Sequence, residues 1–185
     1  MRLAPRWAPS RALAGVVTAA ALASLALPAC SAHPSAGASP TGSSASDVAN
    51  PSLDLPQGTV TVARAGSPEL TLHAQIAETD HARATGLMGV KKMSDQAGMA
   101  FLFGGPTTES FWMKDTLIPL DIAFISHGVI SEIDSMVPCR VPNCPLTTPA
   151  QAYDMALEVN PGYFHTQRLG VGARAAVAGG LPEAS

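Results

Sequence analysis

The stretch that decides the fold is LDIAFISHGVISEI, residues Leu120 to Ile133. Its first half is a short apolar run, and its second half, from Val129, is again rich in β-branched residues, which favour strands. His127 and Gly128 stand between the two halves, and glycine tolerates the positive φ that a two-residue hairpin turn requires. The stretch therefore predicts an antiparallel β-hairpin.

Similar short segments occur on both sides of this hairpin. Alternation of apolar and polar residues over Leu70 to Ala77 predicts a strand buried on one face, with Val60 and Val62 as its hairpin partner. Further strands are expected at Met99 to Phe103, at Tyr153 to Val159, again alternating, and at Val171 to Val177, which closes the sheet.

Two short helices interrupt the strands. Thr79-Asp80 offers an N-cap and Gly86 a C-terminal stop for a helix over His81 to Thr85. Asn160-Pro161 caps a second helix, with proline at its first position and Gly170 past its end. The fold class predicted for residues 58–178 is mainly β, a compact small barrel or sandwich of short strands with two short helices.

Residues 1–30 have the pattern of a lipoprotein signal peptide. Three arginines precede the uncharged run Ala12 to Leu27, whose 16 residues are fewer than the roughly 20 needed to span a bilayer. Leu27, Ala29 and Cys30 resemble a bacterial lipobox, in which Cys30 is acylated and becomes the new N-terminus. We expect the protein to be extracytoplasmic and to be attached to a membrane, its partner, through lipidated Cys30. An ordinary secretory signal or an uncleaved anchor are the alternatives.

The segments that flank the domain are low in large apolar residues. Ser31 to Gln57 is rich in Ser, Ala, Pro and Gly, so it is predicted to be a disordered tether, and residues 179–185 a flexible tail. Without the leader, the chain keeps 8 basic and 14 acidic residues, because all three leader charges are arginines. This acidic balance disfavours nucleic acid as a partner.

Two of the three cysteines remain after export. Cys139 and Cys144 are expected to form a disulfide, because pairing is the default in an oxidising compartment. Two reduced thiols are the alternative. A zinc pair would lack two of the four ligands that a structural site needs, and no histidine lies nearby.

A series of motifs in this order resembles the family called domain of unknown function 192. The motifs are Arg83 to Met88, Gly98 to Phe103, Phe111 to Thr116, Pro119 to Phe124, Cys139 with Cys144-Pro145, Ala156 to Gly162 and Gly170 to Gly172. The resemblance implies a small, mostly β domain, often exported and sometimes lipid-anchored, and implies no activity. Asp115 stands where many relatives carry asparagine.

The segment from Trp112 to Asp121 supplies the first candidate site. Pro119 stiffens the connection between two strands, so Lys114 and Asp115 would point in a fixed direction. In one interpretation Trp112 packs into the core and the charges are merely solvated. In the other, Trp112 forms the wall of a shallow ligand pocket, and Lys114, Asp115 and Asp121 supply its polar contacts.

Three further charged residues have two interpretations each. Asp121 and Glu158 could act as paired carboxylates, or could serve as structural acceptors. Arg83 could bind an anionic ligand, or could form a structural ion pair, for which Glu158 is one candidate partner.

No catalytic set, metal site or cofactor is predicted. Methionines and histidines are dispersed, and the sequence contains neither a Gly-x-Ser-x-Gly elbow nor a phosphate-binding glycine loop. The leading hypothesis is an uncharacterised, lipid-anchored domain that binds a small ligand or protein at the cell envelope, without chemistry of its own. The alternative is an enzyme that acts on an envelope glycan through Asp121 and Glu158.

Overall fold

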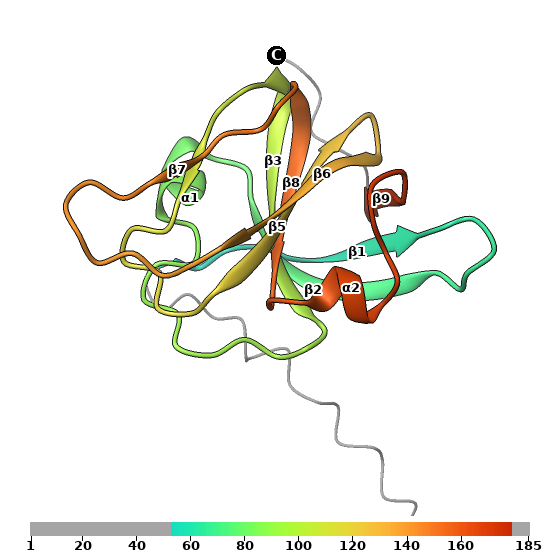
Figure 1. Ribbon diagram of the computed structural model, residues 1–185, viewed down its shortest axis with the longest axis horizontal. Coiled ribbons are helices and arrows are strands. Elements are labelled where there is room, and N and C mark those ends of the chain that lie inside the picture. Colours follow the sequence, from blue (N-terminus) through green and yellow to red (C-terminus); the bar gives the residue numbers. More distant parts are fainter. Residues whose placement is uncertain (1–52, 179–185) are drawn as a thin grey trace, which may run out of the picture. The chain divides into compact units, whose positions relative to one another are not determined.

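The computed structural model describes residues 53–178, which form a closed barrel of seven strands, a two-stranded arm and two short helices (Figure 1). The strand order around the barrel is β1-β2-β3-β8-β5-β6-β9. Its strands are β1 (Gln57–Ala63), β2 (Leu70–Ala77), β3 (Ala97–Thr107), β5 (Leu120–Ser126), β6 (Val129–Met136), β8 (Tyr153–Val159) and β9 (Arg174–Val177). The predicted mainly β fold with two short helices is confirmed.

The β5–β6 hairpin forms where the sequence predicts it. Its turn residues, His127 and Gly128, have φ values of 51° and 73°, the pair of positive values that suits the right-handed twist of a hairpin. The β1–β2 hairpin is also confirmed, with Val60 opposite Leu72. β9 then pairs with β1 along its length and closes the ring, as expected.

Helix α1 (Asp80–Thr85) connects the parallel strands β2 and β3. The Thr79 hydroxyl accepts a hydrogen bond from the Ala82 amide at 3.1 Å, and Gly86 ends the helix at a φ of 49°. Both predicted caps are confirmed, and the helix is one residue longer than expected.

Helix α2 (Tyr163–Thr166) differs from its prediction at both ends. The expected start at Pro161 is wrong, because Gly162 has a left-handed φ of 78° and its amide donates to the Asp121 carboxylate at 2.7 Å. The helix also ends well before Gly170. Here a long-range contact overrides the local proline signal.

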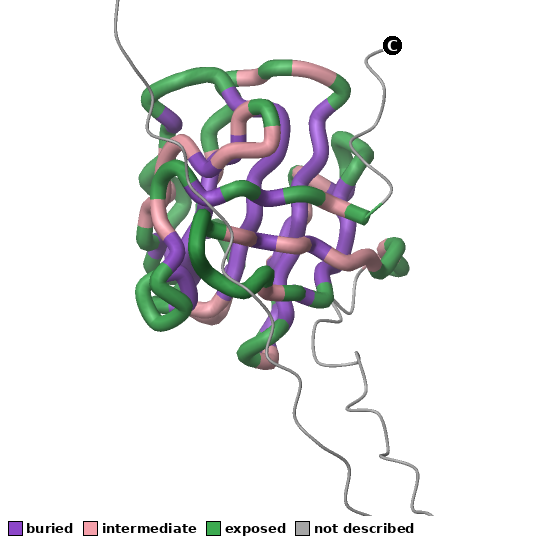
Figure 2. Tube along the Cα trace, turned by 90° about the vertical axis from the view of Figure 1, so that its right-hand side faces the viewer, coloured by how far each residue is buried: buried purple, intermediate pink, exposed green. Residues whose placement is uncertain are grey.

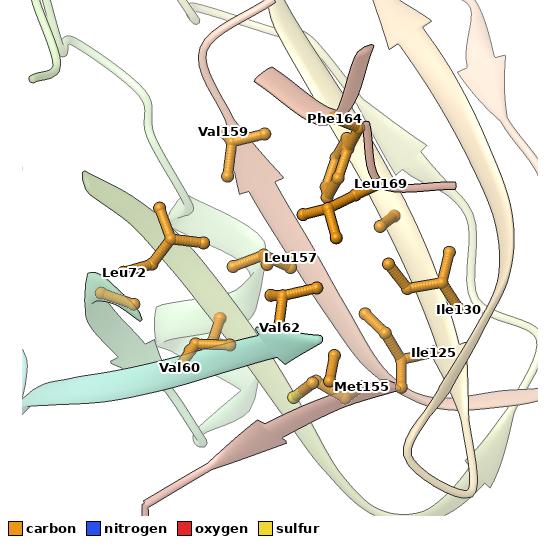
Figure 3. Close-up of a cluster of buried hydrophobic side chains, with 14 of the residues drawn as sticks. Val60, Val62, Leu72, Ile125, Ile130, Met155, Leu157, Val159, Phe164 and Leu169 are labelled. Carbon is orange, nitrogen blue, oxygen red and sulfur yellow. The ribbon is translucent and has the colours of Figure 1, made fainter. Parts of the chain in front are cut away.

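The core has two layers, one on each side of the β3-β8-β5 sheet. The first fills the barrel, where apolar side chains such as Val62, Leu157 and Phe164 converge (Figure 3). The second lies outside and is covered by Ala82 of α1 and by Met113 and Cys139. Most residues of β3, β5 and β8 are accordingly buried, whereas the connections are largely exposed (Figure 2).

Strand β8 is covered on its outer face by this second layer of the core. All seven of its residues are buried, although apolar and polar residues alternate along it. Ala156 lies in the outer layer and Leu157 in the barrel interior. A strand covered on both faces cannot be recognised from one chain segment alone.

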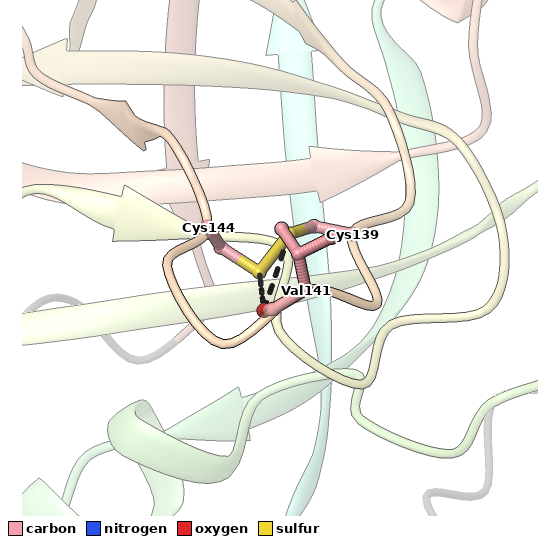
Figure 4. Close-up of a disulfide and its surroundings, with 3 residues drawn as sticks. All are labelled: Cys139, Val141 and Cys144. Carbon is pink, nitrogen blue, oxygen red and sulfur yellow. Dashed lines mark hydrogen bonds between the residues drawn. A yellow bond between two sulfur atoms is a disulfide. The ribbon is translucent and has the colours of Figure 1, made fainter.

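The arm consists of β4 (Phe111–Trp112) and β7 (Leu146–Thr147). The loop that precedes β7 contains the predicted disulfide between Cys139 and Cys144, which is confirmed with a Cα–Cα distance of 5.8 Å (Figure 4).

Several predictions concern the ends of the chain. Cys30, the signal peptide, most of the tether and the tail from residue 179 lie outside the described residues. The folded part begins earlier than Gly58, because Leu55 packs against the core and the Pro56 carbonyl accepts from the Ile76 amide at 2.9 Å. Within residues 53–178, no helix is long and apolar enough to cross a membrane.

Candidate functional site

A hollow of about 330 Å³ opens between α1, β3 and the β4 strand of the arm. Its size is at the lower end of small-ligand sites. Three aromatic side chains form its walls and four polar ones its rim, and the lining residues are Asp80, Arg83, Ala84, Phe103, Glu109, Ser110, Phe111 and Trp112. The sequence singled out only Arg83 and Trp112 of these, because the others come from three separate segments.

Packing of the arm keeps Trp112 at the surface. The neighbouring Phe111 ring lies edge-on to Phe101 at 5.0 Å between centroids and to Phe124 at 5.8 Å, so it anchors β4 in the outer core. Side chains alternate along a strand, and Trp112 consequently remains 45% exposed, opposite Leu146 of β7. The interpretation of Trp112 as a core residue is therefore wrong, and its ring borders the hollow.

Lys114 and Asp115 have different roles from each other. Lys114 is exposed, and its Nζ lies 5.3 Å from the centroid of the Trp112 ring, a cation–π contact. Asp115 is also exposed but has a left-handed φ of 56°, and its backbone carbonyl accepts from the Gly89 amide. Aspartate and asparagine both tolerate this conformation, so the backbone explains why either residue can stand here.

Arg83 acts chiefly as a clamp between α1 and β3. Its guanidinium forms an ion pair with Asp80, donates to the Glu78 and Leu102 carbonyls, and lies 4.9 Å from the Phe103 ring centroid. These contacts occupy most of its donors, which favours the structural interpretation over the binding of an anion. Its partner is Asp80, not Glu158.

Glu158 lies beneath the hollow. A small hole of about 20 Å³ is lined by Glu158 and shares Arg83, Ala84, Phe111 and Trp112 with the hollow. Such a hole holds about one water molecule. The side chain is only 4% exposed, and burial alone raises the pKa of Glu158 to about 8. At neutral pH this carboxyl is mostly an uncharged acid with one O–H donor.

Asp121 lies on the other face of the sheet. In the β5–β8 register Asp121 is opposite Val159, whereas Glu158 is opposite Ile122, and paired residues share a face. The Asp121 carboxylate accepts from the Ser135 hydroxyl and the Gly162 amide, both at 2.7 Å. It joins β5 to β6 and to the start of α2.

This register overturns the paired-carboxylate hypothesis. Asp121 and Glu158 point away from each other with the sheet between them, so they cannot flank one scissile bond. Asp121 therefore does not belong to the hollow, and its structural interpretation holds. In residues 53–178 no group of three or more metal-ligating side chains is gathered at one point.

The chain resembles proteins of known structure. A candidate transcription regulator from Sinorhizobium meliloti is 28% identical, with a TM-score of 0.64 over 69% of this chain and 98% of its own. A protein of unknown function from Novosphingobium aromaticivorans is 29% identical, with a TM-score of 0.60 over 65% of this chain and 85% of its own.

No curated protein matches the chain. The family model that does match, DUF192, is described as "Uncharacterized ACR" and covers residues 60–177, almost all of the barrel. The motifs quoted from the sequence lie inside this range, and the two solved structures share the fold. The chain therefore belongs to the DUF192 family.

Proposed function

We propose that this protein is an extracytoplasmic binding module, and that the hollow beside Trp112 takes a small neutral, hydroxylated ligand such as a sugar unit of an envelope glycan. The observation that carries the proposal is the combination of an exposed tryptophan wall with a buried, uncharged Glu158 in the adjoining hole. Ligand sites typically combine apolar walls with a few fixed polar groups.

The charges of the hollow favour a neutral ligand. Asp80 and Arg83 pair with each other, so Glu109 is the uncompensated charge among the lining residues; Lys114 lies 5.3 Å from the Trp112 ring but does not line the hollow. An anion would be repelled by the Glu109 carboxylate. A sugar ring offers C–H groups that can lie against Trp112 and hydroxyls that can donate to Glu109.

Glu158 would contribute the group that selects among sugars. An uncharged carboxylic acid donates one hydrogen bond, which an acetamido carbonyl can accept. A ligand without such an acceptor would leave the acid with only the water that the hole can hold, so it would gain no hydrogen bond from Glu158. N-acetylated sugars should therefore bind better than plain ones.

The predicted leader and the disulfide support a location outside the cytoplasm. Disulfides persist in oxidising compartments, and Cys139–Cys144 is formed here. Acylation of Cys30 would hold the domain at a membrane, with the segment up to the barrel as its spacer. The relative from Sinorhizobium meliloti is described as a regulator, but the acidic balance of this chain does not favour transfer of a DNA-binding role.

Tryptophan fluorescence offers the test. Trp7 lies in the leader, so Trp112 is the sole tryptophan of a protein that begins at residue 31. Titration with chitotriose should change its emission in a saturable way, because the sugar displaces water from the ring. Cellotriose, which lacks acetamido groups, should bind about tenfold more weakly, as expected for the loss of one buried hydrogen bond.

Variants at the hollow provide the controls. Trp112→Phe keeps an aromatic wall, and its binding is followed by calorimetry, whereas Trp112→Ala should abolish binding. Val171→Ala, which changes an exposed apolar residue outside the hollow, should bind like the wild type. Absence of a saturable response, or equal binding by W112A, would refute the proposal.

A second candidate function is docking of a protein partner on the arm. Among residues 53–178, four of the five exposed large hydrophobic side chains belong to the arm or to the loop next to it: Trp112, Val137, Val141 and Leu146. Clusters of this kind mark interaction surfaces more often than scattered ones do. Leu146→Ser would impair a protein partner and leave a sugar site in the hollow unaffected.

A further inference from the structure

A second cavity lies at the seam of the barrel, between β9 and the β5–β6 turn. Its volume is about 120 Å³, and its lining is Ile125, Gly128, Asp154, Met155, Ala175, Ala176 and Val177. None of these residues lines the hollow beside Trp112. The cavity is therefore a separate feature of the molecule.

The strand pairing explains why a cavity forms at this point of the closed barrel. β9 pairs with four residues of β1, but β6 pairs with it only at Val129 and Arg174. One further backbone hydrogen bond, from the Ala175 amide to the Gly128 carbonyl at 3.0 Å, holds the turn against β9. β6 begins only at Val129, so the last residues of β9 extend past the turn without a partner strand on that side, and the cavity lies between these residues, the turn and strands β5 and β8.

The cavity contains one charged group, Asp154, among apolar walls. Its side chain is only 8% exposed. Oδ2 accepts a hydrogen bond from the His127 amide at 2.8 Å, whereas Oδ1 is buried and receives none from the protein. A buried carboxylate oxygen without a donor is costly, and such atoms are rare in native folds.

Oδ1 of Asp154 lacks a hydrogen-bond donor for a local reason. His127 is a non-glycine residue with a φ of 51°, and its amide is fixed by Oδ2 of Asp154. This contact orients the carboxylate, so Oδ1 cannot turn to another backbone donor without releasing the hairpin turn. The fold thus keeps one unpaired acceptor buried in the wall of an apolar cavity.

We propose that this cavity binds a small organic cation, a primary ammonium group on a short aliphatic chain. The ammonium would donate to Oδ1 of Asp154, and its methylene groups would lie against Ile125, Met155 and Val177. The volume corresponds to about four water-sized groups, which suits an ammonium with three or four carbons.

Other ligand classes fit less well. A divalent metal ion needs several oxygen ligands, and the cavity offers a single carboxylate. An anion would be repelled by that carboxylate. A neutral alcohol could fill the volume, but its hydrogen bond would lack the charge assistance that strengthens an ammonium–carboxylate contact.

The test uses the protein that begins at residue 31 and n-butylammonium chloride as the probe. In amide-resolved NMR, the Gly128, Ala175 and Ala176 signals should shift in a saturable way. n-Butanol, which has the same chain without the charge, should bind at least about tenfold more weakly. Asp154→Asn should weaken n-butylammonium by a similar factor, because it keeps an oxygen for the His127 amide and removes the charge.

A second variant keeps the test decisive if D154N does not fold. Ala176→Leu adds bulk at an exposed position of the lining, so it should close the cavity while Asp154 stays in place. Binding by n-butylammonium should then be lost in a folded protein. Absence of saturable shifts in the wild type would overturn the proposal, as would equal binding by n-butanol or by A176L.

Discussion

Glu158 is a carboxyl group in the middle of a strand that is buried on both faces. Burial raises its pKa from 4.5 to about 8, because the charged form loses its hydration. The folded state therefore binds a proton more tightly than the unfolded state does. As a result, the protonation of Glu158 makes the free energy of unfolding depend on pH.

The sign of that dependence follows from proton linkage. The stabilising contribution of protonated Glu158 is complete below pH 4.5 and is lost as the pH rises toward 8. The slope is at most about 1.4 kcal/mol for each pH unit. Glu158→Gln should remove it, so that the free energy of unfolding measured by urea falls less between pH 5 and pH 8 than in the wild type.

A matched control separates this effect from general acid–base changes. Glu69→Gln alters an exposed carboxyl and should keep the wild-type pH profile. If E158Q and the wild type had parallel profiles, Glu158 would be ionised in the folded protein, and its role as an uncharged donor would be untenable.

At the scale of single elements, strands β3 and β8 approach each other closely at Gly98. A Cβ atom at Gly98 would lie 2.7 Å from the Glu158 carbonyl oxygen, which is backbone and cannot move aside. Gly98→Ala should therefore destabilise the protein by about 1–3 kcal/mol, because the two strands must separate. Thermal unfolding monitored by circular dichroism measures the loss.

Gly105 provides the comparison within the same strand. No heavy atom lies within 4 Å of the position where its Cβ would be, and it has no positive φ. Gly105→Ala should therefore leave the stability within about 0.5 kcal/mol of the wild type. Equal effects of G98A and G105A would contradict the close approach of β3 to β8.

The disulfide stabilises the arm through a short loop. Cys139 and Cys144 are five residues apart, for which the chain-entropy model gives about 2 kcal/mol. Replacing both cysteines by serine should lower the free energy of unfolding by that amount and speed amide exchange in β7 more than in β8. Uniform exchange throughout the barrel would show that the bond has no local role.

Elements with a local signal were predictable from the sequence, and those that depend on distant contacts were not. Thr79 and Gly86 delimit α1, and His127-Gly128 forms the turn of the β5–β6 hairpin. In contrast, the start of α2 depends on the bond from Gly162 to Asp121, which is 41 residues away. The full burial of β8 likewise depends on segments from elsewhere in the chain.

At the scale of the whole molecule, the candidate site shows the same difference between local signals and distant contacts. The sequence identified Arg83, Trp112 and Glu158, and the fold gathers them around the hollow and its hole. It also grouped Asp121 with them, which fails because a one-residue offset between paired strands sends a side chain to the opposite face. Asp154 carried no signal, since only the closed barrel buries one of its oxygens.

The proposed lipid anchor at Cys30 is tested on the whole protein. Mass spectrometry of the protein extracted from membranes should show Cys30 as an acylated N-terminus, and Cys30→Ser should release the protein into the soluble fraction. Several acyl chains are needed for durable attachment, so the variant should lose it completely. A wild-type protein that begins at another residue and is soluble would exclude lipidation.

The proposed function depends on an uncharged Glu158 beneath the hollow. Carbon-13 NMR of labelled glutamate carboxyls, with E158Q to assign the signal, follows this titration directly, with and without chitotriose. We predict a midpoint near pH 8 for the free protein, and a higher midpoint with the sugar bound, because the ligand accepts the acid proton in a hydrogen bond. A midpoint near pH 4.5 that chitotriose does not change would contradict the account.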